Sequence, residues 1–140
     1  MDIKGVEMRA FLLTICLFIA FTTKAFAQDA EPRDIISAQI DAFVAQDVET
    51  AFSFASPTIQ RIFDDPETFG TMVRNGYPMV WNPADVIFLD TRDVEGRFYQ
   101  RVQIIDQAGQ SHTLVYEMVE VGTAWKINGV FGVMPAQPNV

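Results

Sequence analysis

The chain has 140 residues, which is enough for one ordinary domain and too few for two. Its 49% hydrophobic and 20% charged residues are typical of a globular protein and exclude a disordered one. The net charge of −8 argues against polyanionic partners, so we expect neither nucleic acid nor anionic membrane surfaces as partners.

The first 27 residues show the pattern of a secretory signal peptide. Lys4 and Arg9 precede the apolar run AFLLTICLFIAF, and an Ala-x-Ala sequence ends at Ala27. The run is too short to span a bilayer, which needs about 20 apolar residues, so an uncleaved anchor is the less favoured alternative. We therefore expect an exported protein, periplasmic or secreted, with no stable membrane insertion after cleavage. Met8 is an alternative start to Met1.

The single cysteine, Cys16, lies inside this apolar run rather than at its end, which argues against a lipid-attachment site. The mature chain then contains no cysteine, and its core must be stable without a disulfide. Cleavage removes three basic and two acidic residues, so the net charge becomes −9.

Helical signals run from Asp34 to Gly76, after a polar lead-in at 28–33. Apolar residues recur on one helix face from Ile36 to Val44, and Asp34 is the expected cap. Two further starts are marked by a capping residue followed by proline, at Ser56-Pro57 and Asp65-Pro66. The later helical segments are predicted at 47–56, 57–63 and 66–76.

Strand signals replace the helical ones after Gly76. The segment YPMVW, 77–81, is predicted to be extended and to end at Asn82-Pro83. Alternating runs joined by short turns then predict an antiparallel meander, followed by a loose tail at 134–140. The predicted strands are 85–91, 97–106, 111–121 and 124–133. Helices followed by a curved antiparallel sheet make an α+β protein, with the helices on one sheet face and a concave mouth beside them.

The order of elements resembles the nuclear-transport-factor-2-like superfamily. The similarity is carried by Ala42-Phe43 followed by QDVETAF at 46–52, and by Trp125-Lys126-Ile127 with Gly129. The segment GYPMVWNPADVIF is similar to a proteobacterial family of exported proteins known only as a domain of unknown function. The resemblance implies a cystatin-like, cone-shaped barrel over residues 34–133, and it carries over no catalytic residue.

The sequence offers few groups for catalysis. It contains one histidine, no mature cysteine and no phosphate-binding glycine motif, so we expect neither a metal nor a cofactor. His112 is the strongest single candidate for a catalytic residue. It would act as a general base while Tyr116 polarises a carbonyl of the substrate. These two residues would lie about 13 Å apart along the strand, too far for a direct pair. The favoured alternative is that His112 is a partly exposed residue at a strand end.

Aromatic and apolar residues of the strands predict an interior that is either a pocket or a filled core. Phe131 and Ile127 are expected to face this interior, together with the candidate aromatic residues given below. Arg101 is a candidate for an anionic ligand, or else for a surface ion pair with Glu117, which falls on the solvated face. The candidate ligand-binding residues are Tyr116, Met118, Trp125, Phe98, Phe88 and Arg101.

The function predicted from these residues is a non-catalytic binding or assembly module with an apolar pocket for a small ligand. One alternative is a cofactor-free isomerase or dehydratase that uses His112 and Tyr116. Another is a structural accessory of the cell envelope. A homodimer is a further possibility, through an outer sheet face formed by Tyr99, Ile105, Val115 and Val119.

Overall fold

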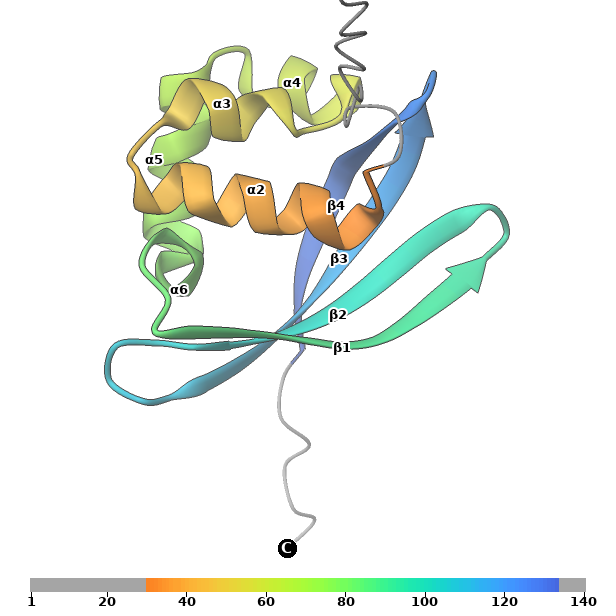
Figure 1. The fold of residues 1–140 in the computed structure, drawn as a ribbon. Helices are drawn as coiled ribbons and strands as arrows, with labels where there is room; N and C mark the ends of the chain where they lie inside the picture. Colours follow the sequence, from red (N-terminus) through yellow and green to blue (C-terminus); the bar gives the residue numbers. More distant parts are fainter. Residues whose placement is uncertain (1–29, 134–140) are drawn as a thin grey trace, which may run out of the picture.

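The computed structural model describes residues 30–133, so the predicted signal peptide and the predicted tail lie outside the described residues. Within this range, helices come first and a four-stranded antiparallel sheet follows (Figure 1). The sheet is curved and does not close, and the helices gather on one of its faces. The predicted α+β class is therefore confirmed. No helix of residues 30–133 is long and apolar enough to cross a membrane.

The four predicted helices are present, and three of them begin as the sequence indicates. The side chains of Asp47, Ser56 and Asp65 each accept a hydrogen bond from the backbone N–H three residues later. The helices are α2 (Pro32–Val44), α3 (Val48–Ser53), α4 (Pro57–Phe63) and α5 (Pro66–Gly76).

The start of α2 and the segment after α5 differ from the predictions. Glu31, not Asp34, caps α2, and the Asp34 carboxylate instead accepts a hydrogen bond from the Glu31 N–H at 3.0 Å. The segment predicted to be extended forms a short helix, α6 (Pro78–Trp81). Pro78 suits the first helical position, and burial of Val80 against the other helices fixes the turn. That packing depends on distant residues, which local sequence does not specify.

The strands are β1 (Asp85–Val94), β2 (Arg97–Ile105), β3 (Ser111–Val121) and β4 (Ala124–Val133), in the order β1-β2-β3-β4. This is the predicted meander. β1 continues three residues past its predicted end, beyond a register irregularity between Phe88 and Thr91.

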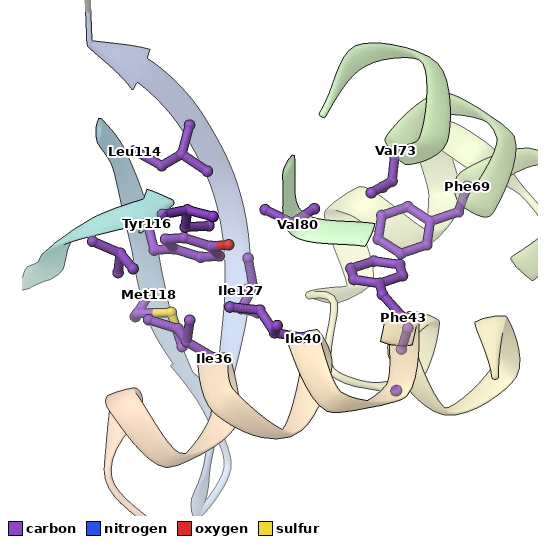
Figure 2. Packing of buried hydrophobic residues seen from close by; sticks show 14 residues of the cluster. Ile36, Ile40, Phe43, Phe69, Val73, Val80, Leu114, Tyr116, Met118 and Ile127 are labelled. Carbon is purple, nitrogen blue, oxygen red and sulfur yellow. The ribbon is translucent and has the colours of Figure 1, made fainter. Parts of the chain in front are cut away.

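The core lies between α2 and the inner face of the sheet. Figure 2 shows Ile36 and Ile40 of α2 pointing towards Met118, Tyr116 and Ile127 of the last two strands. The inner face of β2 contributes further buried residues, as its alternating pattern predicts. They are Gln100, Val102 and Ile104.

A β-bulge at Asn128 changes which side chains of β4 face inward. Met118 pairs with Ile127 and Glu117 pairs with Gly129, so Asn128 has no partner residue on β3. The extra residue reverses the alternation, and Phe131 lies on the outer side of the sheet with 53% of its surface exposed. Phe131 is therefore not buried in the core as predicted, because strict period-two counting assumes an uninterrupted strand, although it does line a pocket beside β4.

Candidate functional site

The candidate site is a pocket between the helices and the edge of β4. Its volume is about 330 Å³, within the range of small-molecule sites. The helices provide an apolar wall and the sheet provides Tyr116 and one stretch of β4. The lining residues are Gln39, Phe43, Ala55, Ile59, Phe63, Phe69, Met72, Val73, Tyr77, Val80, Tyr116, Ile127, Asn128, Gly129, Val130 and Phe131.

Hydrogen bonds from the helical half of the fold hold the edge strand against the pocket. The backbone of Ile127 donates to the Phe54 carbonyl at 2.9 Å and accepts from the Ser56 N–H at 2.8 Å. Three residues further along, the Tyr77 hydroxyl donates to the Val130 carbonyl at 2.9 Å. These contacts satisfy backbone groups of an edge strand, so β4 is fixed as a wall of the pocket.

Tyr116 is the deepest polar residue of the lining, with only 1% of its surface exposed. Its hydroxyl points from the sheet towards Val80 (Figure 2). None of residues 30–133 makes a hydrogen bond to this hydroxyl. Every side-chain polar atom of that range that is fully enclosed does have a partner, so this hydroxyl is not fully enclosed. The hydroxyl therefore opens onto the pocket, where it can donate a hydrogen bond to an occupant.

Burial raises the pKa of Tyr116 far above its ordinary value, and the nearby Tyr77 adds to this effect. The hydroxyl consequently stays protonated and neutral at physiological pH. A neutral phenol in this position is a hydrogen-bond donor and not a base.

Gln39 is the second polar side chain that lines the pocket and is almost completely buried. Its amide nitrogen donates to the Ala51 carbonyl at 3.1 Å, which fixes the orientation of the amide. The amide oxygen makes no hydrogen bond within residues 30–133 and is not fully enclosed.

A hydrogen-bonded chain of side chains lies behind the bulge. The Ser56 hydroxyl donates to Asn128 Oδ1 at 2.7 Å, and Asn128 Nδ2 donates to Glu117 Oε1 at 3.2 Å. Arg97 donates to the same carboxylate oxygen at 2.9 Å. Glu117 is only 6% exposed, so the prediction that it is solvated is wrong. Glu117 lies on the outer face as predicted, but its carboxylate is bonded by Arg97 and Asn128 and lies next to Gly129, as does the Phe131 ring.

Of the predicted ligand-binding residues, Tyr116 alone lines this pocket. Met118 is fully buried beneath α2. Phe98 and Trp125 pack against each other with ring centroids 5.7 Å apart, and the Phe88 ring lies 4.7 Å from the Arg33 guanidinium. Met118 belongs to the buried core, and the other three side chains pack against it.

Arg101 lies on the outer face of the sheet, where it forms an ion pair with Asp90 at 2.9 Å. The expected pair between Arg101 and Glu117 is therefore wrong, because Arg97 occupies the carboxylate. Arg101 and Asp90 are both about half exposed and line a second pocket, of about 420 Å³, with Tyr99 and Val115.

His112 lies outside the pocket lining and faces Asp106, with 2.8 Å between Nε2 and Oδ2. The other carboxylate oxygen of Asp106 accepts hydrogen bonds from the N–H groups of Ala108 and Gln110, at 2.9 Å each. The His112 hydrogen bond is the largest cause of a lowered Asp106 pKa, followed by the Gln110 N–H. His112 thus completes the turn between β2 and β3, and a role as general base stays a prediction.

The helical side of the pocket is absent from the predicted site. Phe63 lies on α4, Met72 on α5, and Tyr77 joins α5 to α6. Apolar residues in such segments are compatible with ordinary core positions. The only local sequence signal for this half of the site is Tyr77 before Pro78, which places an aromatic ring with a hydroxyl group where the chain changes direction. Residues 30–133 contain no group of three or more His, Cys, Asp or Glu side chains placed to hold a metal.

Comparisons with known proteins agree on the fold and name no activity. A family model described as a domain of unknown function, DUF4864, matches residues 25–140. A search of curated proteins gave no match. The solution structure of RPA3114, a SEC-C motif containing protein from Rhodopseudomonas palustris, is similar with a TM-score of 0.54 and 13% identity, over 74% of this chain and 79% of that one.

A second similar structure is a chain named Rd1NTF2_05 that carries five substitutions. Its TM-score is 0.50 at 15% identity, over 72% of this chain and 95% of that one. Likeness at such low identity concerns the fold alone, and it supports the nuclear-transport-factor-2-like cone. The narrower resemblance to exported proteobacterial proteins stays a prediction.

Proposed function

The chain belongs to the DUF4864 family, and we propose that it is an exported, non-catalytic module that binds a small apolar ligand in the pocket beside β4. The pocket itself carries this proposal. Its lining within residues 30–133 is almost entirely aliphatic and aromatic, with few polar side chains. Export is proposed from the N-terminal sequence pattern alone.

The composition of the lining supports binding over acid–base chemistry. Among the described residues, it contains neither Asp, Glu, His, Lys nor Arg. Tyr116 and Tyr77 are the titratable groups, and burial keeps the former protonated. An isomerase or dehydratase needs a group that accepts a proton near the substrate, with a pKa tuned to that task. His112 bonds to Asp106 at a turn outside this lining.

The test is to fill the pocket with a larger side chain and to measure the binding of a neutral fluorescent apolar probe such as N-phenyl-1-naphthylamine. Ile59→Trp on α4 places an indole in the pocket. Ile62→Trp is the matched control, because Ile62 lies on the same helix, is 66% exposed and lies outside the lining. Ile59→Trp should weaken probe binding at least tenfold, and Ile62→Trp should leave it within about twofold. Equal binding by all three proteins would reject the pocket as the binding site.

Assembly through the outer sheet face is a second candidate function. Phe131 is half exposed on that face, and in the strand register it lies opposite Val115. Exposed aromatic side chains next to β-branched ones are typical of protein interfaces. If two copies meet there, light scattering should give a dimer mass for the wild type and a monomer mass for Phe131→Glu.

A further inference from the structure

We infer that the pocket selects neutral ligands that carry one oxygen acceptor, such as a ketone or an ester, with Tyr116 as the residue that recognises it. The inference rests on the proposed binding function and names the chemical class of the ligand. It depends on the Tyr116 hydroxyl, because the other polar side chains of the lining, Gln39, Tyr77 and Asn128, each already donate a hydrogen bond within the fold.

The Tyr116 hydroxyl supplies the selective contact. It is almost completely buried, it opens onto the pocket, and within residues 30–133 it has no hydrogen-bond partner. A buried donor left unpaired by a bound hydrocarbon loses its hydration without compensation. An oxygen acceptor on the ligand restores the missing hydrogen bond, so the site favours ligands that have one.

The same lining disfavours anionic ligands. No cationic side chain among the described residues lines the pocket. A carboxylate would therefore be desolvated without a counter-charge. The net charge of −8 further reduces the local concentration of anions. Fatty acids should be poor ligands, although their chains match the apolar walls.

The Tyr116 hydroxyl stays protonated over the pH range in which binding would be measured. Burial raises the Tyr116 pKa, and no lining residue of the described range is a histidine or carboxylate. Binding of a neutral ketone should consequently be constant between about pH 6 and pH 9, far from the titration of the phenol.

The experiment compares three probes of similar shape by calorimetry: an acetylnaphthalene, an isopropenylnaphthalene and a naphthoate. The wild type should bind the ketone most tightly and the naphthoate most weakly. Tyr116→Phe keeps the ring and removes only the hydroxyl, so it should weaken ketone binding about three- to tenfold. Hydrocarbon binding should stay the same or become tighter, because the variant has no donor to leave unpaired. Thermal unfolding of both proteins checks that the variant is folded.

The outcomes separate this inference from the proposed function. If the hydrocarbon and the ketone lose equal affinity in Tyr116→Phe, or neither changes, Tyr116 does not recognise the oxygen and the inference is wrong while the pocket stands. Tighter binding of the naphthoate than of the ketone also overturns it. If none of the three naphthalene probes binds and Ile59→Trp has no effect on binding of the fluorescent probe, the binding function itself fails, and the inference fails with it.

Discussion

The Tyr77 hydroxyl and the Val130 carbonyl are 53 residues apart in the sequence and 2.9 Å apart in the structure. Tyr77 joins α5 to α6, and Val130 lies on the edge strand β4. Both residues line the pocket. This one hydrogen bond therefore connects the helical wall of the pocket to its sheet wall.

Removing the hydroxyl should loosen that connection. Tyr77→Phe loses one neutral hydrogen bond and should lower the free energy of unfolding by about 0.5–1.5 kcal/mol. Tyr99→Phe removes a hydroxyl from the outer side of the sheet and serves as the control. Urea unfolding monitored by circular dichroism measures both. Equal losses in the two variants would show that the contact between helix and strand contributes nothing specific.

Gly70 marks a close approach between α5 and α3. A Cβ at this position would come within 2.6 Å of Val48 Cγ1, a stiff β-branched side chain. Gly70→Ala should therefore destabilise the fold by about 1–3 kcal/mol, although alanine is the better helix former by about 1 kcal/mol. Val48→Ala removes the methyl group that the new Cβ would meet. The double variant Val48→Ala/Gly70→Ala should therefore lose less stability than the sum of the losses of the two single variants.

Gly76→Ala is the matched control on the same helix. A Cβ there meets nothing within 4 Å, so the variant should be neutral or slightly stabilised. Thermal unfolding of all four variants provides the comparison. A Gly70→Ala protein as stable as Gly76→Ala would disprove the close approach.

Among the hydrogen-bonded side chains behind the bulge, substitution of Glu117 should destabilise the fold most. Glu117→Ala leaves Asn128 Nδ2 without its acceptor in a half-buried position, and should lower the free energy of unfolding by about 1–3 kcal/mol. Arg97→Ala should cost less, about 0–1 kcal/mol, because Arg97 is 59% exposed and its ion pair is screened by solvent. High salt should reduce the ion-pair part of both losses and leave the part of the Glu117 loss that comes from the Asn128 hydrogen bond. A larger loss in Arg97→Ala than in Glu117→Ala would contradict this order.

The turn between β2 and β3 should respond to acid through Asp106. Its pKa is lowered in the folded state, mainly by His112 and then by the Gln110 and Ala108 N–H groups. A depressed pKa means that this carboxylate stabilises the fold above its unfolded pKa of about 3.9, and that the contribution is lost as the pH falls through the folded pKa.

An NMR titration of the side-chain carboxyl carbons tests this directly. The Asp106 midpoint should lie below the ordinary value of 3.8 in the wild type and should rise in His112→Phe. Asp65 is the internal control, because its pKa is lowered by Thr68 and should not respond to His112. An unchanged Asp106 midpoint in His112→Phe would show that the histidine is not its principal partner.

Much of the helical half could be predicted because its signals are local. Ser56-Pro57 and Asp65-Pro66 place a side-chain acceptor and a fixed φ at neighbouring positions, which is sufficient to start a helix wherever the chain lies. Strand alternation likewise placed Tyr116 on the inner face. The site was only partly predictable, since Tyr116 shares the pocket with helical residues that look like ordinary core positions.

By itself, then, the sequence determined the class of the fold, the order of its elements and the starts of most helices, since capping and periodicity act over a few residues. The tertiary structure decided the rest. The bulge at Asn128 turned Phe131 outward and brought Asn128 to Ser56, and packing of Val80 turned an expected strand into α6. These outcomes depend on energies between residues far apart in the chain, so only the folded arrangement could set which side chains surround the pocket.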